Sequence, residues 1–200
     1  MTDLYRTILK PSEGIYKEKG SKFMAFAYPV SSEEEINLYL QDLRKKYHDA
    51  RHHCYAWRLG SGKNRYRVND DAEPSGSAGK PILGQIQSRD LSDVLVVVVR
   101  YFGGTLLGMG GLIRAYRAAA SEALDLNTVT ERKVFESMQV EFGYERMNPV
   151  MKLIKDYDLD FEDQVFDLAC SLRLKVWKRN SEKFVQDVLK IEGCKVTRIE

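Results

Sequence analysis

The sequence predicts a two-domain α+β protein of 200 residues. Residues 131–200 follow a strand–helix–strand–strand–helix–strand order, and an apolar strand at 94–99 runs into a glycine-rich turn and a helix. A polar, turn-prone segment at 126–131 lies between these two patterns. We therefore expect an N-terminal domain at residues 1–128 and a C-terminal domain at residues 131–200.

The N-terminal half begins with a strand pattern at 22–30. Residues 31–48 then show helical spacing, and their start carries a capping box formed by Ser32 and Glu35. Two further strands, at 52–60 and 64–68, are expected to pair through a glycine-containing turn.

A polar loop and a short helix follow within residues 69–87. The run VLVVVV at 94–99 is continuous and β-branched, which is typical of a strand buried on both faces. The helix after the glycine-rich turn presents an apolar stripe that includes Leu112, Tyr116 and Ala120.

The C-terminal half predicts the ferredoxin-like split βαβ motif. The expected strands and helices, in chain order, lie at 133–144, 145–158, 159–166, 168–177, 181–193 and 194–199. Ser181 or Asn180 is the expected N-cap of the second helix. This motif hosts many functions and selects none of them.

Composition excludes several classes of protein. The longest apolar run is far shorter than the ~20 residues that span a bilayer, and the N-terminus lacks an apolar signal core, so we expect a cytoplasmic protein with no membrane contact. Three cysteines without a CxxC pair indicate reduced thiols. A net charge of +2 means that any contact with nucleic acid depends on local patches.

The glycine-rich turn is the first candidate site. Its glycines are Gly103, Gly104, Gly108, Gly110 and Gly111. A glycine-rich turn that opens a helix exposes free N–H groups to an anion. Arg100, Arg114 and Arg117 flank it, and no acidic residue occurs between Asp93 and Glu122. Two interpretations of the glycines remain open: they allow an anion to bind, or they only allow the strand and the helix to pack closely.

The second candidate is the loop NDDAEPSGSAGKP, which combines carboxylates, hydroxyls and glycines. Its candidate residues are Asp70, Asp71, Glu73, Pro74, Ser75, Gly76, Gly79 and Lys80. The carboxylates could hold Mg²⁺, or they could cap a helix and pair with the arginines. We favour the second interpretation and expect no metal or other cofactor. Ser75 is the serine with the most catalytic-looking neighbours, although the sequence holds no Gly-x-Ser-x-Gly elbow.

The third candidate is a basic segment with interleaved aromatic residues. Exposed aromatic rings among cations can stack on RNA bases, whereas strand alternation sends about half of such side chains inward. The residues of this possible stacking patch are His52, Tyr55, Trp57, Arg58 and Arg65.

DDAEPSGSAGKPIL and VLVVVVRYFGGTLLGMGGLIRAY together resemble the IMPACT/YigZ family in its bacterial two-domain form. KGSKFMAFAYPVSSEEE and HHCYAW add to this resemblance. Ala72 stands where many members carry glycine. The family provides no agreed catalytic residues, so we lean away from an enzyme.

The resemblance implies an N-terminal domain like the second domain of a small-subunit ribosomal protein and domain IV of elongation factor G. It also implies a C-terminal domain like domains III and V of that factor. Eukaryotic members regulate translation, so a translation-linked regulator that contacts RNA, the ribosome or a ribosome-associated partner is the leading hypothesis. The alternatives are a protein–protein adaptor without nucleic acid and an enzyme acting on a nucleotide or a phosphorylated metabolite.

Overall fold

A mixed α+β architecture is seen in the computed structural model, which describes residues 3–165 and 169–199. The chain divides into two units, Tyr5–Arg132 and a second unit made of Lys133–Glu200 with the first residues of the chain. Each unit has its own sheet and core, and they are described separately.

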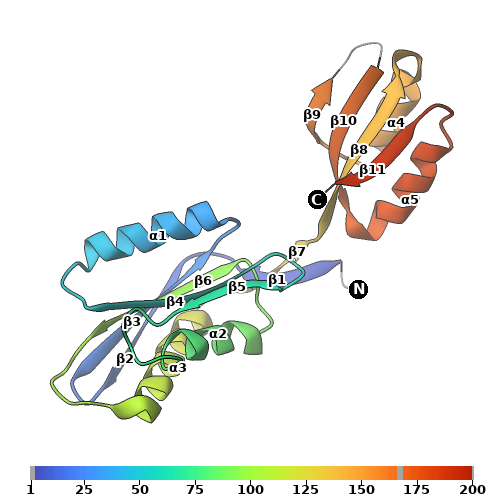
Figure 1. Ribbon diagram of the computed structural model, residues 1–200. Coiled ribbons are helices and arrows are strands. Elements are labelled where there is room, and N and C mark those ends of the chain that lie inside the picture. The colour runs from blue at the N-terminus through green and yellow to red at the C-terminus, as the bar shows by residue number, and fades with distance from the viewer. Residues whose placement is uncertain (1–2, 166–168, 200) are drawn as a thin grey trace. The chain divides into compact units, whose positions relative to one another are not determined.

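The N-terminal unit is built on a five-stranded antiparallel sheet with the order β2-β3-β6-β4-β5 (Figure 1). Its strands are β2 (Ser12–Glu18), β3 (Ser21–Pro29), β4 (His52–Leu59), β5 (Arg65–Asn69) and β6 (Val94–Tyr101). The central strand β6 is fully buried from Val94 to Val99, which confirms the prediction from its apolar run.

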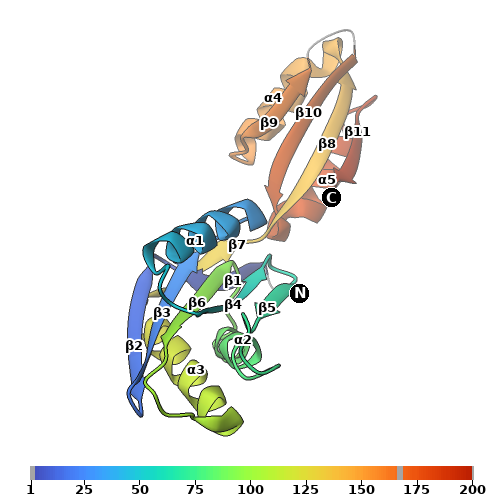
Figure 2. The ribbon, with the colours of Figure 1, turned by 60° about the vertical axis from the view of Figure 1, so that its left-hand side comes forward.

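Helices cover both faces of this sheet, with α1 on one face and α2 and α3 on the other (Figures 1 and 2). Their bounds are α1 (Glu33–Lys46), α2 (Gly79–Ser88) and α3 (Gly108–Asp125). The predicted cap of α1 is confirmed, since the Ser32 side chain accepts a hydrogen bond from the backbone N–H of Glu35.

A two-stranded sheet pairs β1 (Leu4–Ile8) with β7 (Val129–Lys133). The sequence patterns predicted none of β1, β2 and β7 as separate strands. Both strands are short; β7 is largely exposed, and in β1 the buried residues Thr7 and Ile8 are adjacent, so neither has the clear apolar alternation by which a strand is recognised. Ile8 alone in β1 contributes to the large core cluster.

The C-terminal unit has the predicted β-α-β-β-α-β order. Its elements are β8 (Phe135–Gly143), a 3₁₀ turn (Tyr144–Arg146), α4 (Met147–Asp156), β9 (Phe161–Val165), β10 (Ala169–Trp177), α5 (Lys178–Leu189) and β11 (Lys195–Ile199). The antiparallel sheet has the order β11-β8-β10-β9, and its core centres on residues such as Met138, Leu172 and Phe184.

The predicted cap of α5 is wrong, because the helix begins three residues earlier, at Lys178. Ser181 lies inside the first turn, is buried, and donates its hydroxyl to the Lys178 carbonyl. Phe166 and Leu168, the ends of two predicted strands, fall outside the described residues. No helix in the described ranges is long and apolar enough to cross a membrane.

Candidate functional site

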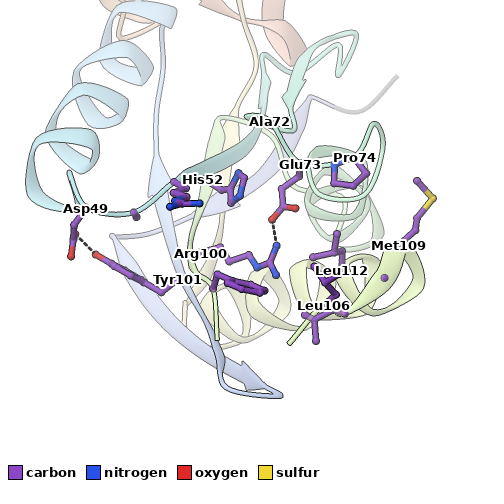
Figure 3. A pocket seen from close by; sticks show the side chains of 15 residues that line it. Asp49, His52, Ala72, Glu73, Pro74, Arg100, Tyr101, Leu106, Met109 and Leu112 are labelled. Atoms are coloured by element: carbon purple, nitrogen blue, oxygen red, sulfur yellow. Dashed lines mark hydrogen bonds and ion pairs between the residues drawn. The ribbon is translucent and has the colours of Figure 1, made fainter. Parts of the chain in front are cut away.

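A cavity of about 870 Å³ lies in the N-terminal unit, where the β6 strand ends and α3 begins (Figure 3). It is lined by residues 49–52, 72–74, 100–102, 106–109 and Leu112. The fold therefore brings the DDAEPSG loop, the glycine-rich turn and the start of β4 to one place. Its size is typical of pockets that take a small molecule.

The first carboxylate of the loop, Asp70, organises the start of α2. It accepts hydrogen bonds from the backbone N–H groups of Gly76, Ala78 and Gly79, at 2.8, 3.0 and 2.8 Å. Burial disfavours the charged form of Asp70, but these three donors and Lys80 outweigh it and lower its pKa. Asp70 thus supplies the cap that Ala78, at the N-cap position, does not.

Asp71 joins the loop to β4 and α1. Its carboxylate accepts from the backbone N–H of His53 at 2.6 Å and from Arg44 Nη2 at 2.8 Å. Burial opposes its ionisation, yet Arg44 and the His53 N–H prevail and lower the pKa of Asp71. Both aspartates are thereby engaged by protein groups, which supports capping and pairing over a magnesium site. Among the described residues, no cluster of three or more His, Cys, Asp or Glu side chains could hold a metal.

Glu73 anchors a buried polar chain that joins four segments. Arg100 Nη1 donates to Glu73 Oε1 at 2.6 Å, and the Tyr116 hydroxyl donates to the same oxygen at 2.7 Å. The Cys54 thiol in turn donates to the Tyr116 oxygen at 3.3 Å. Burial raises the pKa of the Tyr116 hydroxyl and of the Cys54 thiol far above their ordinary values, so both stay protonated.

This ion pair corrects one prediction. Arg100 has no acidic neighbour in the sequence, but in the fold Glu73 faces it, and their side chains are only 7% and 4% exposed. The sequence separation of 27 residues concealed the pairing.

The glycines of the turn differ in the physical reason for which each position needs a glycine. A Cβ at Gly103 would lie 1.9 Å from the carbonyl carbon of Gly20, so a side chain there would collide with the turn between β2 and β3. Gly104 has a φ of +86°, in the left-handed region. Gly110 meets only the end of the Arg114 side chain, at 3.6 Å. A Cβ at Gly111 would lie 2.9 Å from Leu107 Cβ, so packing accounts for Gly103 and Gly111, while Gly110 has room for a side chain.

The predicted cations fall into three places. Lys80 and Arg117 line a groove of about 460 Å³ between α2 and α3, together with Gly76, Gln85 and Ile113. Arg114 is exposed, and its guanidinium lies against the first turn of α3. Arg100 belongs instead to the cavity. From the sequence, Arg100, Arg114 and Arg117 were expected around the glycine-rich turn, and Lys80 in the acidic loop.

The predicted RNA-stacking patch is wrong. Tyr55 and Trp57 are 8% and 6% exposed and belong to the core beneath α1, so their faces cannot receive a base. His52 and Arg58 lie at alternate positions on the other face of β4. Arg65 is exposed and pairs with Glu33, and Arg58 donates to two backbone carbonyls.

Sequence reasoning missed the apolar rim of the cavity. Phe102, Leu106 and Met109 are 54%, 84% and 53% exposed, and all three line the cavity. The signal was present as large apolar side chains inside a glycine-rich turn, a place where polar residues are usual.

The fold and this site define a two-unit α+β protein with a cavity formed by a glycine-rich turn and an acidic loop. Residues 19–124 match the model of the Impact N-terminal domain. The chain belongs to the IMPACT family, which confirms the resemblance seen in its motifs.

Individual relatives agree with this assignment. The IMPACT family member YvyE of Bacillus subtilis is 39% identical over 144 residues, which cover 72% of this chain and 66% of that protein. A protein IMPACT homolog of Saccharomyces cerevisiae is 40% identical over 96 residues, covering 46% of this chain and 36% of its own. The crystal structure of a hypothetical protein matches 100% of this chain and 99% of its own, with a TM-score of 0.82 and 25% identity.

Proposed function

We propose that this chain is a translation-linked regulator, rather than an enzyme, and that it binds RNA or the ribosome through the face formed by α2 and α3. The observation that carries the proposal is the charge of this face. Lys80, Arg114 and Arg117 are exposed, and no Asp or Glu occurs in residues 76–89 or 100–121. No ion pair is found for these three cations among the described residues.

A groove whose Lys and Arg form no ion pair with the described residues suits a phosphate backbone. The groove between α2 and α3 has Lys80 and Arg117 on its walls and the amide of Gln85 beside them. Phosphate contacts by Lys and Arg release counterions, so binding weakens steeply as salt rises. Because the aromatic residues of the predicted stacking patch are buried, the α2/α3 face is the main candidate for RNA binding. Cations on this face would contact the phosphate backbone more than the bases.

The test is co-sedimentation with ribosomes and binding to ribosomal RNA at low and high salt. We expect Arg114→Glu/Arg117→Glu to abolish binding and the wild type to lose affinity as salt rises. The matched control is Lys45→Glu/Lys46→Glu, which makes the same charge change on exposed positions of α1, on the opposite face of the sheet. Equal losses in both double variants would show that net charge alone governs the interaction and would contradict a specific face.

A protein–protein adaptor is the second candidate, and the exposed apolar rim of Phe102, Leu106 and Met109 favours it. Nuclease treatment distinguishes binding to RNA from association with a protein partner. Association that survives nuclease and ignores salt, but is lost in Leu106→Glu, would replace the RNA proposal with the adaptor.

A further inference from the structure

We infer that the cavity at the end of β6 binds a small phosphomonoester with an apolar or aromatic body, of which a mononucleotide is a representative. This inference goes beyond the proposed function, because it concerns a different set of residues from the groove that carries Lys80 and Arg117. Three properties of the cavity support it: a buried cation, the open start of a helix, and an apolar rim.

The buried cation is Arg100. Its side chain is 7% exposed and lines the cavity, and Glu73 takes a hydrogen bond from Nη1. Its Nε is buried and has no hydrogen-bond partner among the described residues. An unpaired buried donor on a charged group is costly, so a guanidinium that turned to meet a ligand acceptor from the cavity would be stabilised. Arg is also the side chain whose planar fork best fits phosphate oxygens.

The start of α3 lies at the same cavity, where Gly108 and Met109 form part of the wall. Leu107 at the N-cap position makes no side-chain cap, and the first turn carries no acidic residue. Within the described part of the chain, no side chain accepts from the first N–H groups of this 18-residue helix, and the helix dipole favours an anion there. Figure 3 shows Arg100 and the α3 residues Met109 and Leu112 around one hollow.

The remaining charged groups of the wall include a second cation, Arg51. The carboxylates of the wall are Asp49, which accepts from the Tyr101 hydroxyl at 2.7 Å, and Glu73, which accepts from Arg100 and Tyr116. Their charge opposes an anion and is offset by Arg51 and Arg100.

The apolar rim specifies the other end of the ligand. Phe102, Leu106 and Met109 expose half or more of their surface beside the cation. Exposed apolar side chains gathered around a cavity usually contact a ligand. A free inorganic anion would leave them in water, whereas a base or another apolar body attached to the phosphate would cover them.

The test follows backbone amide signals of Gly108, Gly110 and Gly111 by NMR during titration with inorganic phosphate, adenosine 5′-monophosphate and adenosine. We expect the monophosphate to bind at least about tenfold more tightly than either other probe, because it alone engages both ends of the cavity. Leu106→Ala should weaken the monophosphate and leave inorganic phosphate unchanged. Lys80→Ala/Arg117→Ala, in the groove, should change neither.

Two variants of the buried pair decide the role of Arg100. Arg100→Lys should weaken both phosphate-bearing probes at least about tenfold. Glu73→Gln keeps the shape of the side chain and removes the charge that opposes the ligand, so it should tighten both probes. The inference is overturned if neither phosphate-bearing probe shifts the glycine signals at millimolar concentration, or if Glu73→Gln keeps the wild-type amide spectrum and gives no gain. Neither result would bear on RNA binding by the groove, which is measured with different variants.

Discussion

The two faces of the five-stranded sheet are built in different ways. The face beneath α1 is an aromatic and aliphatic core, with Phe26, Tyr55 and Trp57 packed against Ile36 and Leu43. The face beneath α2 and α3 is lined mostly by small and β-branched side chains beside Phe23, and a chain of four polar side chains joins its strands β4 and β6 to α3 and the acidic loop. Alternate residues of the same strands point to the two faces. Neighbouring residues in one strand therefore belong either to the core beneath α1 or to the face that carries the candidate site.

The largest expected effect on the α1 face comes from Trp57→Ala. Removing this buried ring leaves a cavity and should lower the free energy of unfolding by about 3–5 kcal/mol, measured by urea denaturation. The control is Tyr66→Ala on the neighbouring strand, which is 55% exposed and should cost less than about 0.5 kcal/mol. A Trp57 variant that kept its stability but lost RNA binding would restore the stacking hypothesis.

Arg100→Ala tests the other face and should also cost about 3–5 kcal/mol, because Glu73 would remain as a buried charge without its partner. Urea denaturation measures this loss. The matched control is Arg65→Ala, which breaks the exposed pair with Glu33 and should cost at most about 1 kcal/mol. Similar costs for the two variants would mean that water reaches the Arg100–Glu73 pair.

Tyr116→Phe should have an intermediate effect. It deletes the hydroxyl that donates to the Glu73 carboxylate and accepts from Cys54, at a cost of about 1.5–3 kcal/mol in thermal or urea unfolding. Tyr28→Phe makes the same chemical change on the α1 face, where Tyr28 stacks on Tyr39 at 4.1 Å between ring centroids. We expect that control to stay close to wild type. An equal loss there would remove the distinction between a polar and an apolar face.

His53 gives the smallest effect and concerns pH. Burial, followed by the nearby Arg44, lowers the pKa of His53 below its ordinary 6.5, although Asp71 opposes this. The folded state therefore prefers neutral His53, and its contribution is complete above pH 6.5 and is lost as pH falls toward the lowered pKa.

Urea denaturation between about pH 7.5 and 5 should show this decline in the wild type and a flatter profile in His53→Gln. The exposed His48→Gln is the control and should keep the wild-type slope. An unchanged slope in His53→Gln would assign the acid sensitivity to other groups.

The sequence predicted most of the architecture because local patterns carry it. The apolar run at 94–99, the Ser32 cap and the order of elements in the C-terminal unit each depend on residues close in the chain. The family motifs likewise indicated the loop and the glycine-rich turn. The short strands β1 and β7 were missed because no apolar alternation marks them.

The site was less predictable because its decisive contacts are distant in sequence. Nothing near Arg100 indicates Glu73, and nothing near Cys54 indicates Tyr116, 62 residues away. The stacking patch failed for a related reason, since strand alternation fixes which residues share a face but not which face is covered. Tyr55 and Trp57 are buried because α1 covers the face of the sheet on which they lie.

The pairing of β1 with β7 has a consequence for synthesis of the chain. The strand at Leu4–Ile8 finds its sheet partner only at Val129–Lys133, and the Leu9 N–H reaches the Thr128 carbonyl at 2.9 Å. At about 5–20 residues per second, the first strand waits on the order of ten seconds after it is made before its partner exists. The time at which β1 pairs with β7 is therefore set by the speed of translation rather than by the intrinsic rate of strand pairing.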